Sequence, residues 1–305
     1  TGRVASSAGM RAVLGLIAID FPSAWANDGD EYLHKGLQVH DQFRTNPIIH
    51  TAFAPHAPYS VSNGILERIR TLADELDIPI HMHVHETRHE VDEAIKNHGL
   101  RPLERLDQLG LLNPNLIAVH MTQLRETDIE AVAESGASVV HCPQSNLKLA
   151  SGFCPVADLV EAGVNVALGT DGAAANNDLD LLNEAQTAAL LAKGVAADAK
   201  AVNAFQALEM MTINGAAALG LEERIGSIEP GKQADLCAID LGHPATQPLH
   251  HVVSQVIYAA SRSQVSDVWV AGRRLLNSGK LATIDEAGVM KSAAGWQQKL
   301  SAFEN

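Results

Sequence analysis

The strongest constraint on the fold is a repeated alternation between short apolar segments and stretches with helical spacing. Six apolar segments rich in β-branched residues occupy residues 11–18, 48–54, 80–85, 116–121, 138–142 and 164–169. Each is short and apolar enough to be a buried strand of a parallel sheet. Between two of them, Ile65, Ile69, Leu72 and Leu76 follow one another at intervals that place them on one helical face. The alternation predicts an α/β fold in which helices cover a parallel sheet.

Polar residues gather where these predicted strands end. They are His56, His83, Glu86, His120, His141 and Asp171. A (β/α)8 barrel builds its site from the carboxyl ends of several different strands. A doubly wound sheet instead gathers its ligands at one switch point, and its GxGxxG loop is absent from this sequence. The distribution therefore favours a barrel over a doubly wound sheet.

The character of the sequence changes after a predicted helix at residues 204–219. Glycine and proline punctuate two predicted short strands, at 225–228 and 235–239, and a strand pair is predicted at 265–276. We therefore expect a partial barrel, a small β-sandwich appendage and a terminal helix. Their predicted bounds are 1–220, 221–285 and 286–305.

The net negative charge of the chain argues against some classes of binding partner. Its 22 Lys and Arg against 36 Asp and Glu leave a formal charge of −14, which offers no basic surface to nucleic acid or anionic lipid. The three cysteines form no CxxC pair, so no disulfide framework or thiolate metal site is predicted. The apolar runs are shorter than the roughly 20 residues of a membrane span, and the opening residues lack a signal-peptide pattern. We expect a cytoplasmic protein that binds a small molecule.

Three histidines, His81, His83 and His85, alternate with apolar residues and are followed by Glu86. In a strand, the three imidazoles share one face and would point into a barrel. A satisfied core histidine is the plainer interpretation of any one of them. Residues 85–89 also match the HExxH protease motif, but that motif needs both histidines on a helix, and the strand pattern up to His85 opposes it.

Asp171 and His120 each close an apolar strand, in LGTDG and AVHM. An aspartate that opens a turn or a hydrogen-bonded core histidine would explain either residue alone. Together with the histidine-rich segment they supply the parts of metal-assisted hydrolysis. Zinc lowers the pKa of a bound water to about 7, an aspartate can accept its proton, and a glutamate can donate one to the substrate. The Cys142 thiol beside His141 is interpreted as a buried strand-end cysteine, not as a nucleophile.

Several segments resemble a known family. They are APHAPYS at 54–60, HMHVHET at 81–87, AVH at 118–120, VHCPQSNLKLASG at 140–152, LGTDGAA at 168–174 and GSIEPGKQADL at 226–236. They resemble the amidohydrolase superfamily, and within it the 5'-methylthioadenosine/S-adenosylhomocysteine deaminases, which are grouped with the triazine hydrolases. The resemblance covers almost the whole chain. It implies a metal-dependent hydrolase barrel, one zinc ion, a purine nucleoside substrate and a homo-oligomer.

The resemblance also implies roles for individual residues. His83 would be a metal ligand from the fifth barrel strand, and Asp171 both a ligand and the water-activating base on the eighth. Glu86 would protonate the purine ring nitrogen while binding the substrate, and His120 would steady the attacking water. His56 and Arg11 would contact the substrate.

Two departures from the family pattern qualify these expectations. No His-x-His pair precedes Arg11, so the six strands correspond to barrel strands three to eight, and we expect the first two strands and half of the β appendage to lie upstream of Thr1. Ala175 stands where the family often has serine. Three alternatives therefore stay open: a deaminase of another amino-heterocycle such as guanine, a triazine dechlorinase, and a catalytically incomplete metal-binding fragment.

Overall fold

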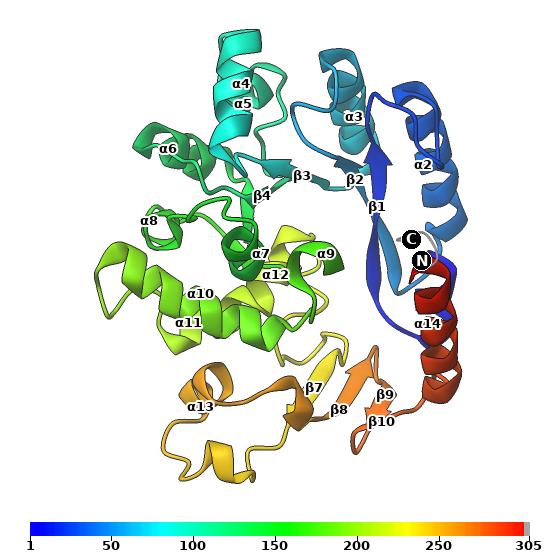
Figure 1. Cartoon of the computed structure of the whole chain (residues 1–305), viewed down its shortest axis with the longest axis vertical. Coiled ribbons are helices and arrows are strands. Elements are labelled where there is room, and N and C mark those ends of the chain that lie inside the picture. Colours follow the sequence, from blue (N-terminus) through cyan, green and yellow to red (C-terminus); the bar gives the residue numbers. More distant parts are fainter. Residues whose placement is uncertain (302–305) are drawn as a thin grey trace.

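The computed structural model describes residues 1–301 (Figure 1). Within them, six strands form one parallel sheet. The strands are β1 (Ala12–Ala18), β2 (Ile49–Pro55), β3 (Ile80–Val84), β4 (Leu116–His120), β5 (Ser138–His141) and β6 (Val166–Leu168). Each of the six strands predicted for this sheet is present, with its ends shifted by at most two residues.

The strand order distinguishes the two architectures that the sequence left in competition. Every strand pairs with its neighbours in the chain, in the order β1-β2-β3-β4-β5-β6. A doubly wound sheet reverses its order at a switch point, whereas a (β/α) barrel keeps the order of the chain. The barrel-type prediction is confirmed, and the carboxyl ends of all six strands meet at one edge of the sheet.

One helix precedes the first strand and the others follow strands, and most of them lie around the outside of the sheet (Figure 1). The first of them are α1 (Gly2–Ala8), α2 (Gly29–Phe43), α3 (Asn63–Leu76), α4 (Arg88–His98), α5 (Pro102–Gln108) and α6 (Glu126–Ser135). They continue with α7 (Pro143–Lys148), α8 (Val156–Glu161), α9 (Ala173–Asn176), α10 (Leu181–Ala196), α11 (Ala204–Met210) and α12 (Ile213–Ala218). The helix predicted at 204–219 is therefore two helices. Among residues 1–301, no helix is long and apolar enough to cross a membrane.

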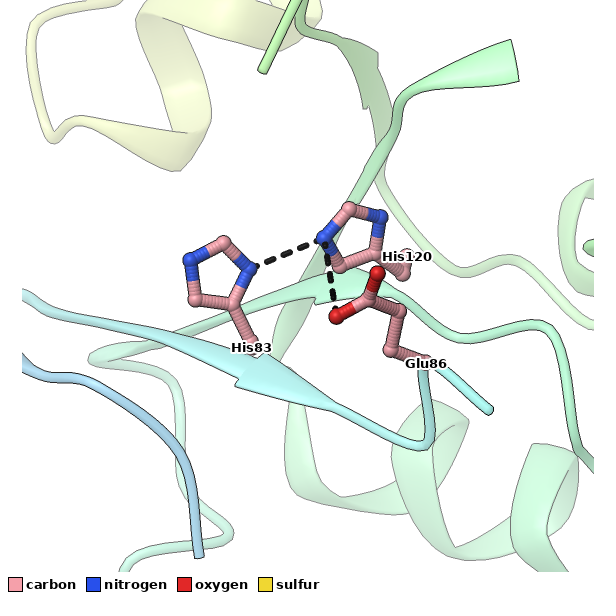
Figure 2. Close-up of side chains that lie close together, drawn as sticks. All are labelled: His83, Glu86 and His120. Carbon is pink, nitrogen blue, oxygen red and sulfur yellow. Dashed lines mark hydrogen bonds and ion pairs between the residues drawn. The ribbon is translucent and has the colours of Figure 1, made fainter. Parts of the chain in front are cut away.

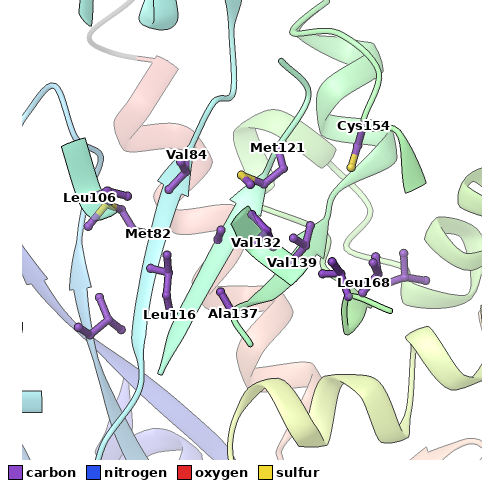
Figure 3. Close-up of a cluster of buried hydrophobic side chains, with 14 of the residues drawn as sticks. Met82, Val84, Leu106, Leu116, Met121, Val132, Ala137, Val139, Cys154 and Leu168 are labelled. Atoms are coloured by element: carbon purple, nitrogen blue, oxygen red, sulfur yellow. The ribbon is translucent and has the colours of Figure 1, made fainter. Parts of the chain in front are cut away.

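The core lies between the sheet and these helices. Figure 3 shows part of it, where Met82, Val84 and Leu116 of the strands meet side chains from the helices. On α3 the fully buried residues are Leu66, Ile69 and Ala73, while the predicted residues Ile65, Leu72 and Leu76 only flank this stripe. The apolar spacing thus predicted both the helix and the side that packs on the core, although the fully buried stripe lies to one side of the predicted residues.

The second sheet is antiparallel and has the order β10-β9-β8-β7. Its strands are β7 (Leu236–Ile239), β8 (Val265–Val270), β9 (Arg273–Asn277) and β10 (Lys280–Leu281), with α13 (Val252–Tyr258) inserted before β8 and α14 (Glu286–Ser301) following. The pair predicted at 265–276 is confirmed. The last residues of the predicted terminal helix, 302–305, lie outside the described residues.

The prediction of a strand at residues 225–228 is wrong. Residues 225–227 form a bend and residue 228 has no regular structure, and Gly226 adopts a left-handed φ of 94°. A Cβ at Gly226 would lie 2.7 Å from the Ala216 Cβ and 3.0 Å from the Ile213 Cα. The glycine therefore serves a close approach to α12, which a strand would not allow.

Candidate active site at the carboxyl ends of the strands

Three predicted site residues meet where β3 and β4 end. His83 lies on β3, His120 is the last residue of β4, and Glu86 lies two residues beyond β3. The His83 Nδ1 lies 2.8 Å from the His120 Nε2, and a Glu86 carboxylate oxygen lies 3.8 Å from the same Nε2 (Figure 2). One ligand atom from each residue lies within 4.8 Å of the others. Three strand-end positions are thus brought into one cluster.

The backbone is strained where it supports this cluster. His85, His120, Met121 and Asp171 all adopt positive φ angles, a conformation that costs energy in residues other than glycine. Each lies at or just beyond the carboxyl end of a strand, so the chain turns sharply there. These turns aim polar side chains across the edge of the sheet instead of along it.

Asp171 lies at the same face, beyond β6. Its carboxylate accepts hydrogen bonds from the Ser145 hydroxyl at 2.6 Å and from the Gly172 N–H at 2.7 Å. Burial raises the pKa of Asp171, but these bonds and the nearby imidazoles of His120 and His83 outweigh it, so the pKa is lowered overall. Asp171 is therefore an ionised carboxylate close enough to the histidine pair to interact with it.

His56, beyond β2, joins the cluster from the other side. Its ring centroid lies 5.4 Å from that of His83, and its Nδ1 lies 2.9 Å from the Ser60 hydroxyl. The exposed Tyr59 ring meets it edge-on at 5.7 Å. The predicted substrate-contacting histidine thus lies beside the cluster.

The structure does not bring Arg11 to this face, which corrects its prediction as a substrate contact. Arg11 precedes β1 and lies at the amino edge of the sheet, whereas the cluster lies at the carboxyl edge. Its guanidinium donates to both oxygens of Asp235, at 2.5 and 3.0 Å, and to the Gln233 side chain at 2.5 Å. Arg11 therefore ties the parallel sheet to the segment that leads into β7.

Two other histidines near the strand ends, His85 and His141, are buried. His85 lies outside α4, so it cannot form the helical HExxH site with His89. Its Nε2 accepts the Leu103 N–H at 3.1 Å, and burial followed by the charge of Arg101 lowers its pKa to about 4. His141 is fully buried, and burial lowers its pKa to about 3. His85 is thus a hydrogen-bonded core histidine, whereas the buried Nδ1 of His141 has no hydrogen-bond partner among the described residues.

Cys142 has no nucleophilic character. Its side chain is buried, and this burial raises the pKa of the thiol far above its ordinary value. Only the thiolate is an effective nucleophile. The interpretation of Cys142 as a buried strand-end cysteine agrees with this environment.

Several supporting residues were not predicted from the sequence. The Asn146 Oδ1 lies 2.8 Å from the His120 Nδ1 and so holds the ring with its Nε2 toward His83. The Ser151 hydroxyl lies 3.4 Å from the Glu86 carboxylate. Ser145, Asn146 and Ser151 all belong to the segment 140–152, whose motif pointed to the family without assigning roles.

The donor set fits a divalent metal ion. Imidazole nitrogens together with carboxylate oxygens are ordinary ligands of zinc, and the cluster offers two of the first and, with Asp171 nearby, carboxylates of the second kind. Burial, with the neighbouring His120 and His56, lowers the pKa of His83 to about 4. A neutral imidazole is the form that binds a metal.

Comparison with known proteins shows to which family the chain belongs. The model of the amidohydrolase family matches residues 3–275. A 5-methylthioadenosine/S-adenosylhomocysteine deaminase of Teredinibacter turnerae is 53% identical over 97% of this chain and 67% of its own length. A 5'-deoxyadenosine deaminase of Methanopyrus kandleri is 39% identical over 96% of this chain and 68% of its own. The chain thus spans about two thirds of these relatives.

Solved structures give the same result. An adenosine deaminase from Xanthomonas campestris with bound zinc superposes with a TM-score of 0.97 and 55% identity, over 99% of this chain and 69% of that one. The atrazine chlorohydrolase of Arthrobacter aurescens, in complex with zinc, superposes with a TM-score of 0.89 at 21% identity over 96% of this chain and 67% of that one, a likeness of fold alone. With a family model over most of its length and relatives above 50% identity, the chain belongs to the amidohydrolase family.

Proposed function

We propose that this chain carries the catalytic barrel of a zinc-dependent deaminase that acts on 5'-methylthioadenosine or S-adenosylhomocysteine. The reaction replaces the purine amino group by oxygen, so that an adenine nucleoside and water give a hypoxanthine nucleoside and ammonia. The observation that carries the proposal is the meeting of His83, Glu86 and His120 at the strand ends. The choice of substrate is supported by relatives at 37–53% identity that are named as deaminases of these two compounds.

His83 and Asp171 are proposed to hold the zinc ion together with ligands from the rest of the protein. Bound zinc would supply a water of lowered pKa, near 7, as the nucleophile. Asp171 is suited to accept a proton from that water, because Ser145 and the Gly172 N–H hold it as an ionised carboxylate. His120, held by Asn146, orients the water through its Nε2.

Glu86 donates a proton to the ring nitrogen while the water oxygen bonds to the amino-bearing carbon. Asp171 passes the proton it took from the water to the amino group, and the C–N bond breaks to release ammonia. The remaining hydroxyl proton returns to Glu86, which leaves the carbonyl and the N–H of hypoxanthine. Proton transfer by such positioned groups typically contributes 10²–10⁴-fold to a rate.

A substrate panel tests the proposal. The natural full-length protein, loaded with zinc, is assayed for ammonia release and for the change in ultraviolet absorbance with adenosine, methylthioadenosine, S-adenosylhomocysteine, guanine and a chlorotriazine. We expect methylthioadenosine or S-adenosylhomocysteine to have the highest kcat/KM. Turnover of guanine or the triazine without turnover of any adenine nucleoside would overturn the assignment.

A further inference from the structure

Glu90, in the first turn of α4, is a buried carboxylate directly behind the loop that carries Glu86. The residue is only 7% exposed. One carboxylate oxygen accepts the Glu86 N–H at 2.7 Å, and the other accepts the His85 N–H at 3.2 Å. Both oxygens of Glu90 thus bind the backbone of the strand-end turn.

This arrangement differs from an ordinary helix cap. In a capping box, the residue three positions into the helix accepts the N–H of the N-cap residue itself. Here the N-cap is Thr87, whose hydroxyl accepts the Glu90 N–H at 3.2 Å, but the Glu90 carboxylate reaches past Thr87 to the two preceding residues. The bonds from Glu90 therefore constrain the loop before the helix.

The same loop is held from its other side by Thr122, which follows β4. The Thr122 hydroxyl donates to the Glu86 carbonyl at 2.7 Å, and the Thr122 N–H donates to the His85 carbonyl at 3.0 Å. The N–H of Glu86 is thus bound by Glu90, and its carbonyl by Thr122. Both backbone hydrogen-bonding groups of Glu86 are therefore bound by the side chains of other residues.

The burial of Glu90 makes its ionised form less favourable in the folded chain. Burial raises the pKa of Glu90 to about 7, against the effect of the hydrogen bonds from Glu86 and His85, which lower it. Among the ion pairs found in residues 1–301, none includes Glu90. An exposed acidic side chain would serve α4 equally well as a cap. The burial of Glu90 is explained if its main role is to hold the loop at His85 and Glu86 and not to cap α4.

We propose that Glu90 is a positioning residue that holds the Glu86 backbone so that the Glu86 carboxylate reaches the substrate ring nitrogen. The proposal rests on the proton-transfer role of Glu86 given above. A displaced proton donor impairs the transition state more than the binding of substrate, so the loss should fall on kcat and not on KM.

The test is Glu90→Gln in the full-length zinc enzyme. The amide keeps the shape of the side chain, but its NH2 group cannot accept a backbone N–H, so one of the two bonds is lost. We expect kcat to fall at least tenfold, with KM changed less than threefold and the zinc content unchanged. A crystal structure of the variant should show the Glu86 backbone displaced from its place beside Thr122.

Two matched variants of the same helix separate positioning from capping and from charge. Thr87→Val removes the N-cap hydrogen bond to Glu90 and lowers the melting temperature, while Glu93→Gln removes an exposed carboxylate that pairs with Lys96. Both should keep kcat within threefold of the wild type. A kcat for Glu90→Gln no lower than that of Thr87→Val would overturn the proposal.

A crystal structure of the Glu90→Gln variant keeps the two proposals distinguishable. If the wild-type protein deaminates no adenine nucleoside, the proposed function fails, and the position of Glu86 in the Glu90→Gln crystal still tests the positioning. An undisplaced Glu86 backbone in that crystal would overturn the role of Glu90 whatever the enzyme's activity.

Discussion

The two ends of the parallel sheet use charged side chains in opposite ways. At the carboxyl end, His83, Glu86 and His120 meet with positive φ angles nearby, and buried polar atoms of His141 and Asn146 have no hydrogen-bond partner among the described residues. At the amino end, Arg11 and Asp235 form a largely buried ion pair, with both guanidinium and carboxylate hydrogen-bonded.

The carboxyl end thus gathers polar side chains in one cluster, whereas the amino end holds an ion pair between distant segments. Unsatisfied polar atoms and left-handed backbone cost free energy, and proteins keep them mainly at functional sites. The Arg11–Asp235 pair instead joins segments 224 positions apart in the chain. We therefore expect substitutions at the carboxyl end to change catalysis and substitutions at the amino end to change stability.

The largest expected effect is that of Glu86→Gln. Because its proposed work is proton transfer, turnover should fall about 10²–10⁴-fold, while the melting temperature and the zinc content, measured by metal analysis, stay unchanged. His83→Asn is the matched comparison, and it should lose zinc. If Glu86→Gln also lost zinc, Glu86 would be a metal ligand and not a proton donor.

A smaller effect is expected at the amino end, from Arg11→Gln or Asp235→Asn. Either leaves a partly buried charge without its partner, which should lower the free energy of unfolding by about 2 kcal/mol, as measured by urea denaturation. The kcat and KM of the folded enzyme should stay unchanged. A raised KM with unchanged stability would restore Arg11 as a substrate contact.

The exposed Arg68–Asp30 pair is the control for this substitution, since both side chains are more than half exposed. Arg68→Gln should change the free energy of unfolding by less than about 1 kcal/mol. A loss equal to that of Arg11→Gln would show that burial does not set the size of the effect.

A pH-dependent effect on stability is expected from Glu184, which is buried on α10. Burial, and then the charges of Asp178 and Asp180, raise its pKa to about 7, although the Gln144 N–H and Asn176 side chain donate to it. Because the folded chain then binds the proton more tightly than the unfolded chain, its contribution to stability is present below pH 4.5 and is lost as the pH rises through 7.

Urea denaturation at pH 5 and pH 8 measures this contribution. The fall in the free energy of unfolding between the two should be smaller in Glu184→Gln than in the wild type, and unchanged in Glu130→Gln, which alters an exposed position on α6. The same fall in Glu184→Gln as in the wild type would contradict the assigned cause.

Much of the fold could be predicted because its signals are local. The apolar segments predicted each strand of the parallel sheet to within two residues, since burial on both faces requires continuous apolar sequence. Local patterns failed where a tertiary contact decided the outcome. The segment predicted as a strand at 225–228 is irregular instead, and Gly226 within it lies close to α12.

For the candidate site, too, some features could be predicted from local sequence and others depend on tertiary contacts. The sequence by itself indicated which residues are candidates for the chemistry, because a polar residue that closes an apolar strand is visible in the chain. Only the tertiary structure decided that His83 meets His120 at 2.8 Å, that Glu90 lies behind Glu86, and that Arg11 belongs to the opposite edge of the sheet. Those facts depend on strand register and on contacts between distant segments, and the spacing of residues along a chain does not encode either one locally.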